Sequence, residues 1–532
     1  MSFVLSKHLP LLATAPDGIQ KLRGLILELA MRGKLVPQDP NDEPATELLE
    51  RIAQEWAQLG VENKGKKSKA VPVVGEEARP FEVPESWRWI RLAQLNPEFQ
   101  NGESSRGAAS GHEMVVLRLA DISDGKISLS NTRSIILPEI SIEKYQLQKN
   151  DLLVIRVNGS AEIVGRLILC DTSLTAIYCD HFIRVRVRDT VIAPRFLRLI
   201  GDAPVTRRQI QSLFITTAGQ KTVNQGHMGG LIIPFPPLAE QHRIVAKVDE
   251  LMALCDRLET EQADAESAHV RLIDTLLGTL TQSTDAADLA GSWQRLAAHF
   301  DTIFTTERSL TALKQTILQL AVTGNLAPRD PEEVPVRGKL GDFVEFLNGY
   351  AFKSEWFTES GVRLLRNANV SHGCCDWIDT AYVTRDRLEE FKRFELAAGD
   401  LVLSLDRPII NTGLKIARVS QQDLPCLLLQ RVAKISPRSD LVDLDYLSIW
   451  FNSPAFIQTI TPGRSNGVPH ISTKQVSELP FVRYSITEQR IIVTKVNQLM
   501  KLLDRLKADI TESCDRQTRL ASTLIETALE AA

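Results

Sequence analysis

The chain has 532 residues, of which 43% are hydrophobic, and its formal net charge is −4. A chain of this length is expected to fold as about three or four domains, and its apolar content suffices for their cores. The acidic balance excludes a surface that is basic throughout, but not a local basic patch. No apolar run reaches the roughly 18 residues that a membrane-spanning helix needs.

The cysteines and histidines predict neither a disulfide framework nor a metal site. The seven cysteines are scattered, and no pair has the C-x-x-C spacing of a zinc or redox motif. The nine histidines do not cluster at the spacing of metal ligands. The N-terminal residues lack the small-residue cleavage pattern of a signal peptide. We therefore expect a mature chain, without a bound metal, in the reducing cytoplasm.

A short helix near the N-terminus recurs in the second half of the chain. Apolar residues at helical spacing predict a helix over 18–33, and Gly33 is the residue expected to end it. Residues 22–40 match residues 313–331 at 10 of 19 positions, with an offset of 291. This offset is larger than the offset of 248 between the two long helices described next. The difference locates an insertion in the first copy at about residues 41–83.

The strongest repeat begins a long helix in each half of the chain. Residues 240–258 and 488–506 align without gaps at an offset of 248, and 12 of 19 positions are identical. Apolar residues then alternate at spacings of four and three, which is the heptad pattern of a helix that packs against another helix. The predicted seams comprise Ile244, Val248, Leu251, Cys255, Leu258, Leu272 and Leu276 in the first helix, and Ile492, Val496, Leu499, Leu503, Leu506, Leu520 and Leu524 in the second. Two matching seams of equal length favour pairing with each other over packing of each on its own domain. His269 occupies a seam position, where a polar residue helps to fix the register.

Two stretches of mixed secondary structure precede the long helices. Residues 84–236 contain short runs rich in Val and Ile, punctuated by glycines. Strands are predicted at 114–119, 151–157, 164–169, 181–187 and 231–235, and helices at 194–200 and 205–214. Residues 336–483 repeat this plan more loosely, with Asn101-Gly102 matched by Asn348-Gly349. A repeat of about 250 residues is far longer than a solenoid unit and indicates an internal duplication.

These patterns predict an α+β fold with two mixed α/β domains and two long coiled-coil helices. The predicted regions are an N-terminal helical region with its linker (1–83), a first globular domain (84–236), a central region with the first long helix (237–335), a second globular domain (336–483) and a C-terminal long helix (484–532).

No motif in the chain predicts catalysis. Gly60 to Lys67 comes within one residue of a phosphate-binding loop, but Lys67 stands where Ser or Thr must hold magnesium. The run also follows a predicted helix instead of a strand, and it continues into the basic linker 64–69. Asn96-Pro-Glu-Phe99 weakly resembles the Asn-Pro-Pro-Tyr loop of adenine methyltransferases, but no Gly-rich cofactor loop precedes it. We interpret the two segments as a linker and a turn.

Charge is distributed unevenly along the chain. Residues 100–235 hold 16 Lys and Arg against 12 Asp and Glu, a net +4, whereas residues 236–330 hold 8 against 14, a net −6. Residues 336–483 are nearly neutral, with 18 against 17. Arg184, Arg186 and Arg188 alternate along a predicted strand, and a row of arginines suits phosphates or guanine edges. An ordinary solvated strand face would give the same pattern.

Two polar loops at equivalent places are further candidates for contacts with nucleic acid. Residues 216–227 and 461–470 carry amide, hydroxyl and imidazole groups just before the entry to each long helix, although both could be plain connectors. The candidate DNA-binding residues are Arg184, Arg186, Arg188, Arg207, Arg208, Lys221, Asn224, Arg431, Arg464, Asn466, His470 and Lys474.

The combination of motifs resembles the specificity subunits of type I restriction–modification systems. The run IIPFPPLAEQ from Ile232 to Gln241 leads into a heptad helix, and a degraded copy runs from Leu479 to Gln489. The short helix that ends in GKLVPQDP, from Gly33 to Pro40, belongs to the same pattern. The resemblance covers nearly the whole chain.

This resemblance implies a DNA-binding subunit with a pseudo-two-fold internal repeat. Each globular domain would be a target-recognition domain for one half of a bipartite sequence, and the two long helices would pair antiparallel as a spacer. The subunit would have no catalysis and no cofactor of its own. Its partners would be double-stranded DNA, two methyltransferase subunits that bind S-adenosylmethionine, and two motor–nuclease subunits that use Mg and ATP.

The sequence also leaves two alternative hypotheses open, each from another functional class of protein. A stand-alone DNA methyltransferase or restriction enzyme would transfer methyl groups or cleave DNA without partners. A coiled-coil adaptor would bind proteins through its globular domains and leave no footprint on DNA.

Overall fold

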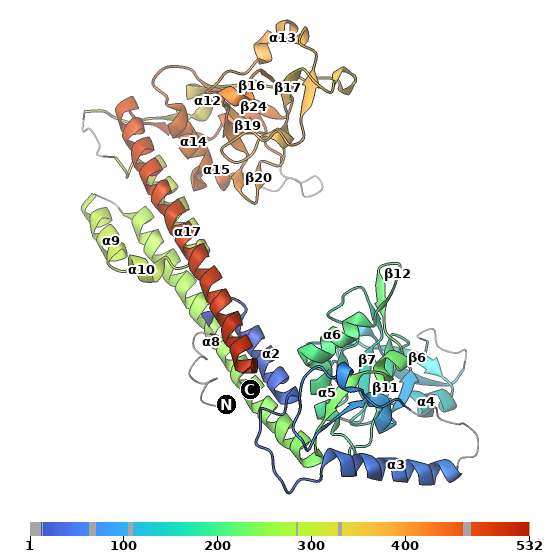
Figure 1. The fold of residues 1–532 in the computed structure, drawn as a ribbon. Helices are drawn as coiled ribbons and strands as arrows, with labels where there is room; N and C mark the ends of the chain where they lie inside the picture. The colour runs from blue at the N-terminus through green and yellow to red at the C-terminus, as the bar shows by residue number, and fades with distance from the viewer. Residues whose placement is uncertain are drawn as a thin grey trace. The chain divides into compact units, whose positions relative to one another are not determined.

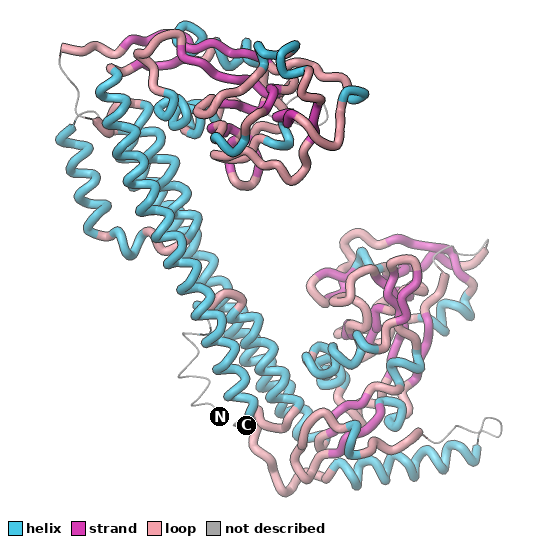
Figure 2. The backbone as a smooth tube through the Cα atoms, turned by 45° about the horizontal axis from the view of Figure 1, so that its top comes forward, coloured by secondary structure: helices cyan, strands magenta, loops and turns pink. Residues whose placement is uncertain are grey.

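The computed structural model describes residues 12, 14–62, 71–104, 110–283, 286–327, 332–460 and 470–530. These residues form two compact units (Figure 1). Unit 1 comprises Met1–Ala263 and Cys514–Ala532, and unit 2 comprises Asp264–Ser513. Each unit contains one globular region with its sheets and a part of both long helices (Figure 2). The fold is therefore a mixture of helix and sheet.

The described residues of unit 1 form five small sheets with short helices around them. Its strands are β1 (Arg88–Arg91), β2 (Glu98–Asn101), β3 (His112–Leu117), β4 (Ile122–Ser123), β5 (Lys126–Ile127), β6 (Arg133–Leu137), β7 (Leu152–Ile155), β8 (Val157–Asn158), β9 (Leu167–Leu169), β10 (Ala176–Tyr178), β11 (Phe182–Arg186), β12 (Ile215–Thr217), β13 (Gln220–Thr222) and β14 (Ile232–Phe235). Its helices are α2 (Gly18–Met31), α3 (Ala45–Glu62), α4 (Glu139–Tyr145), α5 (Pro194–Asp202), α6 (Pro204–Ser212) and α7 (Gln225–Gly229), with 3-10 turns η1 (Glu76–Ala78), η2 (Leu92–Leu95) and η3 (Leu119–Asp121). Besides the β4–β5 hairpin, the main sheets have the orders β2-β11-β7-β9, β10-β3-β6, β12-β13-β8 and β1-β14.

The central sheet of unit 1 separates two apolar cores. Side chains alternate across a strand, so Leu152 and Val154 of β7 join the core with α5, whereas Leu153 and Ile155 join the core with β3 and β10. All four residues of β7 are buried. This is why the sequence reads there as a continuous apolar run and not as an alternation of apolar and polar residues.

Unit 2 is built on a sheet of the same order. Its strands are β15 (Val336–Lys339), β16 (Val344–Asn348), β17 (Val362–Leu365), β18 (Ala381–Val383), β19 (Leu401–Ser404), β20 (Ile409–Ile410), β21 (Gly413–Leu414), β22 (Ile416–Arg418), β23 (Cys426–Leu428), β24 (Val432–Pro437) and β25 (Pro480–Arg483). Its helices are α9 (Ala286–Ala298), α10 (Phe300–Ile303), α11 (Glu307–Val322), α12 (Leu340–Phe343), α13 (Arg387–Glu390), α14 (Leu444–Asn452), α15 (Pro454–Ile457) and α16 (Thr473–Ser477), with 3-10 turns η4 (Ser354–Trp356), η5 (Asn367–Asn369), η6 (Lys392–Phe394) and η7 (Gln421–Asp423). The order β16-β24-β19-β22 repeats β2-β11-β7-β9 with the same antiparallel neighbours.

The recurring short helices α2 and α11 end alike and pack alike. Gly33 and Gly324 follow them with positive φ angles of 67° and 75°. A side chain at either glycine would also collide with a neighbour, Pro84 in unit 1 and Tyr484 in unit 2. In unit 1, α2 packs against α5 and α6; in unit 2, α11 packs against α14 and α15. The predicted end of the first helix at Gly33 is confirmed.

The two long helices are α8 (Leu238–Gln282) and α17 (Ile486–Glu530), with 45 residues each. In unit 1, Ile244, Val248 and Cys255 of α8 share a core with Ala521 of α17. In unit 2, the later part of α8 shares a core with the earlier part of α17, through the buried residues Ile273, Leu277, Leu280, Ile492, Val496 and Leu503. Among the described residues, no helix is both long enough and apolar enough to cross a membrane.

The predicted seam is wrong in the later part of each helix. Leu272 and Leu520 are 50% and 54% exposed, and the buried residues are instead Ile273 and Ala521. The heptad pattern advances 35 residues in ten turns, from Ile244 to position 279, whereas an α-helix of about 3.6 residues per turn advances 36, to Leu280. Leu280 is fully buried. The apolar face therefore follows the period of an ordinary α-helix, and the heptad assignment falls one residue behind. Leu276 and Leu524 are consequently only half-buried.

Candidate nucleic-acid interface

A buried glutamine ties the start of each long helix to its globular region. The Gln241 amide accepts a hydrogen bond from the Ala193 backbone N–H (2.8 Å) and donates one to the Pro236 carbonyl (3.0 Å). Gln489 accepts from the Asp443 backbone N–H (2.8 Å) and donates to the Tyr484 carbonyl (2.8 Å). Ala193 and Asp443 are the residues that precede α5 and α14. Each glutamine thus fixes the direction in which its long helix leaves the globular region of the same unit.

The neighbouring glutamates serve different purposes in the two units. Glu240 is fully buried and accepts hydrogen bonds from the Trp87 indole (2.8 Å) and the Gln38 amide (2.5 Å). Burial raises the pKa of the Glu240 carboxyl, and these two donors oppose the shift. Glu488 instead accepts from the backbone N–H and hydroxyl of Ser485 at the start of α17.

The arginines on strand β11 are engaged inside unit 1. Arg184 is only 2% exposed and forms an ion pair with Glu98. The Arg186 guanidinium binds both oxygens of buried Asp151, at 2.6 and 2.8 Å. These contacts replace the expected open row of arginines with internal ion pairs, because a strand at the centre of a sheet has little exposed face. Arg188, just beyond the strand, pairs with Glu55 of α3 at 2.7 Å.

The two arginines on α6 differ in exposure. Arg207 donates three hydrogen bonds to the carbonyls of Ala161, Glu162 and Val164, and burial lowers its pKa. It thereby holds the loop after β8. The Arg208 side chain is 69% exposed and lies 3.3 Å from Glu28.

A polar edge of unit 1 brings together residues from three separate segments. Lys221 on β13 donates to the Gly159 carbonyl (2.9 Å), which ties the exposed β12–β13 hairpin to the loop after β8. Asn224 caps α7 by accepting from the His227 N–H (2.8 Å). The next residue, Gln225, donates from its side chain to Oδ1 of Asn101 at 3.0 Å.

Unit 2 has an equivalent edge with different side chains. Ser472 caps α16, and the following residue, Thr473, accepts from the Asn348 amide at 3.3 Å. Asp406 follows β19 and binds Arg431 (2.8 Å) and His470 (2.7 Å). The Arg431 side chain is 64% exposed and the His470 side chain is 49% exposed.

We call these two groups of residues the recognition edges. Edge 1 comprises Asn101, Lys221, Asn224 and Gln225, and edge 2 comprises Asn348, Asp406, Arg431, His470, Thr473 and Lys474. In both, the asparagine of the Asn-Gly turn bonds the residue after the cap of a short helix. Amide groups can bond adenine edges, and cations can bond guanine or phosphate.

The edges contain only some of the candidates expected from sequence. Lys221 and Asn224 lie on edge 1, and Arg431, His470 and exposed Lys474 lie on edge 2. Arg464 and Asn466 fall in 461–469, outside the described residues. Sequence reasoning included Gln225 in the candidate loop 216–227 without naming it as a DNA-binding residue, and it missed Thr473 and Asp406. The repeated Asn-Gly pair was visible, but its partners lie more than 120 residues away and are found only in the fold.

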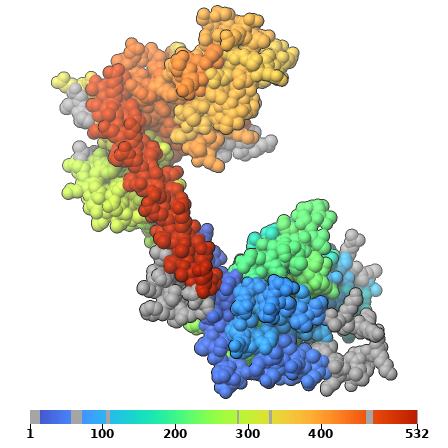
Figure 3. All heavy atoms as spheres, in the orientation of Figure 1, coloured from blue at the N-terminus to red at the C-terminus, as the bar shows by residue number. Residues whose placement is uncertain are grey.

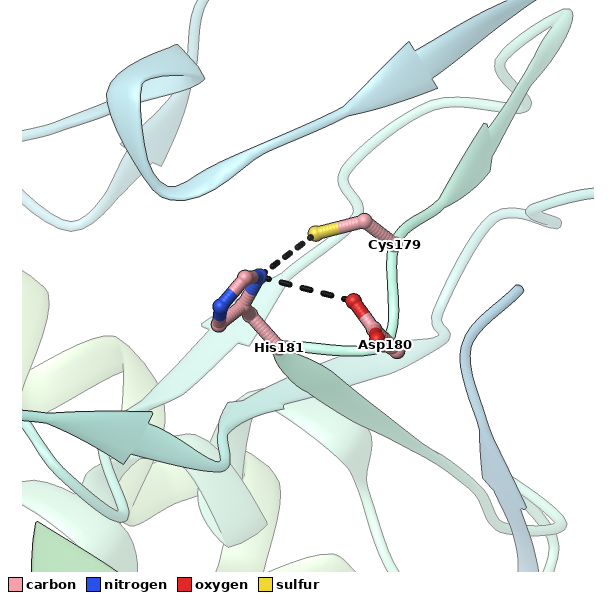
Figure 4. Close-up of side chains that lie close together, drawn as sticks. All are labelled: Cys179, Asp180 and His181. Atoms are coloured by element: carbon pink, nitrogen blue, oxygen red, sulfur yellow. Dashed lines mark hydrogen bonds and ion pairs between the residues drawn. The ribbon is translucent and has the colours of Figure 1, made fainter. Parts of the chain in front are cut away.

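One cluster in unit 1 holds three potential metal ligands, Cys179, Asp180 and His181 (Figure 4). The Cys179 sulfur and an Asp180 carboxylate oxygen each lie 3.5 Å from Nδ1 of His181. The three residues are consecutive in the turn between β10 and β11, and burial raises the pKa of the Cys179 thiol, which opposes the thiolate that binds metals. The matching turn of unit 2, Leu429 to Arg431, carries no such ligands. We assign no metal to this cluster.

The comparisons with known proteins agree on one protein family. The family described as type I restriction modification DNA specificity domain matches residues 118–266. The type I restriction enzyme EcoAI specificity subunit of Escherichia coli is 41% identical over 96% of this chain and 94% of its own length. The EcoEI specificity subunit of the same species is 29% identical over the same shares of both chains. A solved structure from work on complex assembly and conformational transition of the type I R-M system covers 85% of this chain and 99% of its own, with a TM-score of 0.52 and 17% identity.

Proposed function

Because the chain belongs to the family of type I restriction–modification specificity subunits, which recognise DNA targets, we propose that its two globular regions recognise the two halves of a bipartite DNA sequence. The proposed target-recognition domains are residues 84–236 and 336–483. Edge 1 would contact one half-site and edge 2 the other.

The observation that carries this proposal is the duplicated hydrogen bond at the edges. Asn101 with Gln225 and Asn348 with Thr473 occupy the same place in equivalent sheets. Around this shared element the chemistry differs, with a lysine and amides on edge 1 and an aspartate flanked by Arg431 and His470 on edge 2. A common frame with different side chains is what two unrelated half-sites require.

The long helices would act as an antiparallel spacer between the domains. The packing of early α8 with late α17 in unit 1, and of late α8 with early α17 in unit 2, supports this arrangement. A helix of 45 residues is about 68 Å long at roughly 1.5 Å per residue. This exceeds one turn of DNA, about 34–36 Å.

The subunit would have no catalytic residue, metal or cofactor of its own. Methyl transfer would come from two methyltransferase subunits that bind S-adenosylmethionine, and cleavage from two motor–nuclease subunits that use Mg and ATP. The internal repeat supports two identical partners on one chain, since equivalent surfaces bind equivalent proteins.

The test is to reconstitute the chain with its methyltransferase subunit and to map the methylated sites on genomic DNA. A motif of two short specific halves around an unspecific gap is expected. Methylation without sequence preference would contradict the proposal. Methyl transfer by the purified chain alone would contradict its non-catalytic role.

A further inference from the structure

Unit 1 contains a pocket of about 610 Å³ between the end of β1, helix α6 and the stretch from α7 to β14. Three residues that line it, Arg91, Arg208 and His227, carry or can carry a positive charge. None of the described residues that line the pocket is acidic, and several, such as Val205 and Leu213, are apolar. The pocket therefore suits an anionic ligand.

Two nitrogen atoms of these lining residues lack a partner. Nε of Arg91 and Nδ1 of His227 are buried and have no hydrogen-bond partner among the described residues. Oδ1 of Asn224 accepts from the His227 N–H, so the Asn224 amide nitrogen faces Nε2 of His227 at 3.3 Å and donates to it. Nδ1 then carries the hydrogen in the neutral ring. Buried donors without an acceptor are rare and cost free energy, so an acceptor from outside the chain would stabilise this arrangement.

The two arginines use only part of their hydrogen-bonding capacity. Nη1 of Arg91 donates to the Gly230 carbonyl at 3.1 Å. The exposed Arg208 donates to Glu28 at 3.3 Å, and Glu28 also lies 3.9 Å from Arg32. A guanidinium has more N–H donors than these contacts require. Two guanidinium groups and an imidazole together match the several oxygens of a phosphate group.

The equivalent place in unit 2 is occupied by a side chain of the protein itself. At the offset of 248, Arg91 corresponds to Lys339, and Gly230 corresponds to Glu478. Lys339 and Glu478 form an ion pair. In unit 1, the glycine supplies no such carboxylate, and Arg91 remains available to another anion.

The other two cations of the pocket are also replaced in unit 2. His227 corresponds to Gln475 at the same offset. Arg208 corresponds to Gln458, counted from the proline that begins α6 and α15. Three cations in unit 1 thus correspond to one cation in unit 2, and that one is paired with its own carboxylate.

One wall of the pocket comes from the insertion that only the first copy contains. Ala78 and Pro80 line the pocket and belong to residues 41–83, which the second copy lacks. Figure 3 shows this N-terminal part of the chain, in blue, against the green part of unit 1, which includes α6. The wall and the additional cations therefore occur together in the first copy.

We propose that this pocket is a phosphate-binding site of unit 1, in which Arg91, Arg208 and His227 bind the phosphate oxygens. The phosphate could belong to the backbone of bound DNA or to a free phosphorylated molecule. The position favours the DNA backbone, because His227 contacts Asn224 of edge 1. This source rests on the proposed function. It implies that the first half-site is held by a phosphate contact that the second half-site lacks.

Gly230→Glu is the most informative variant, because it copies the carboxylate of unit 2 into unit 1. The backbone angles nearly match, with φ −77° and ψ −9° at Gly230 and φ −81° and ψ −7° at Glu478. The new carboxylate should pair with Arg91 and take the place of the phosphate. Gly230→Ala is the matched control without the charge. Gly291→Glu, on α9 of unit 2, is the control for the added charge.

The first experiment titrates the purified full chain with inorganic phosphate and follows binding by phosphorus NMR. The wild type and both controls should bind one phosphate. Gly230→Glu should bind it more weakly by about tenfold or more. Arg208→Ala should have the same effect, and its side chain is 69% exposed, so the fold should be retained.

The second experiment uses the reconstituted complex and DNA duplexes in which single backbone phosphates around the first half-site are replaced by neutral methylphosphonates. One replacement should weaken binding of the wild type by about tenfold and should not weaken binding of Gly230→Glu further. The slope of log affinity against log salt concentration should be smaller by about 0.9 for this variant. Its sequence preference should be unchanged, because a phosphate contact carries no sequence information.

The two experiments distinguish the sources of the phosphate. A methylphosphonate position that affects the wild type but not Gly230→Glu identifies the DNA backbone. Binding of inorganic phosphate without such a position identifies a free phosphorylated ligand. Absence of both effects would overturn the proposal, as would equal phosphate binding by Gly230→Glu and the wild type. Failure of the proposed function is separate, since it would appear as absent sequence preference in the wild-type complex, and the first experiment needs no DNA.

Discussion

Gln225 donates a 3.0 Å hydrogen bond from its side-chain amide to Oδ1 of Asn101, and so joins the start of α7 to the end of β2. The two residues are 124 positions apart in sequence. Neither side chain belongs to an apolar core, so the bond shapes a surface and contributes little to burial. Its counterpart between Asn348 and Thr473 makes the same junction in unit 2.

This junction predicts half-site-specific effects. Asn101→Ala should weaken binding of the complete complex to its target by about tenfold. The substitution removes an amide group that can contact a base, and it removes the hydrogen bond that holds the Gln225 side chain in place. A change in the first half-site of the DNA should then reduce the binding affinity of the variant complex less than it reduces the affinity of the wild-type complex. Discrimination at the second half-site should be unchanged.

The same substitution in unit 2 supplies the reciprocal control. Asn348→Ala should relax discrimination at the second half-site only. Quantitative binding to a panel of DNA duplexes, each altered in one half, measures both effects. Equal loss at both half-sites for either variant would contradict the assignment of one edge to each half.

Arg186 should matter more for stability than for DNA binding. Its removal would leave the carboxylate of Asp151 buried without its bidentate partner. Breaking a buried pair costs about 3–5 kcal/mol, and partial exposure of the guanidinium reduces this to roughly 2–3 kcal/mol. Urea unfolding of Arg186→Ala, monitored with a probe in the first globular domain, measures the change in the free energy of unfolding.

The double variant Arg186→Leu with Asp151→Leu serves as a comparison, since it leaves no unpaired charge. It should be more stable than Arg186→Ala alone. A wild-type unfolding midpoint for Arg186→Ala, together with weakened DNA binding, would instead restore the arginine to the DNA-contacting surface.

The sequence predicted the elements well where local pattern determines them. The end of α2 two residues before Gly33, the end of α5 near Ile200, and the strands around Leu152 and Val185 follow from turn residues and apolar runs. The phase of the long helices at Leu272 could not be obtained in this way. A drift of about 20° per heptad is too small to see over two heptads, yet it shifts the buried face by one residue over five.

Side-chain partners at the candidate site were equally out of reach of local patterns. The alternation of Arg184 and Arg186 correctly indicated a shared strand face, but not that the face is covered by Glu98 and Asp151. Glu98 lies on the neighbouring strand β2, and Asp151 is the residue just before the other neighbouring strand, β7. Pairing between strands depends on the order of the sheet, which one sequence does not reveal.

The buried carboxyl of Glu240 predicts a pH dependence of stability. Because burial raises its pKa in the folded state, the unfolded chain ionises first as the pH rises. Stability contributed by this group is thus present below the unfolded pKa of about 4.5 and falls as the pH rises through the folded value.

Glu240→Gln removes this titration and keeps an acceptor for the Trp87 indole. Its unfolding temperature should therefore decrease less than that of the wild type as the pH rises above about 4.5. Differential scanning fluorimetry at several pH values gives the comparison. Parallel curves for the two proteins would show that the carboxyl does not titrate differently in the folded and unfolded states.

The spacer proposal predicts the length of the unspecific gap in the target. The side chains of residues 259–268 of α8 are nearly all exposed, as are those of 511–516 of α17, so insertions there should disturb no core. Four extra residues in both helices would lengthen the pair by about 6 Å, at roughly 1.5 Å per residue. With about 3.4 Å per base pair, the gap should grow by about two base pairs. Sequencing of methylated sites measures the length of this gap directly.

The same insertion in only one helix should instead abolish specific methylation, because it offsets the buried residues of α8 from those of α17 within each unit. An unchanged gap in the doubly extended chain would show that the helices do not set the distance between half-sites.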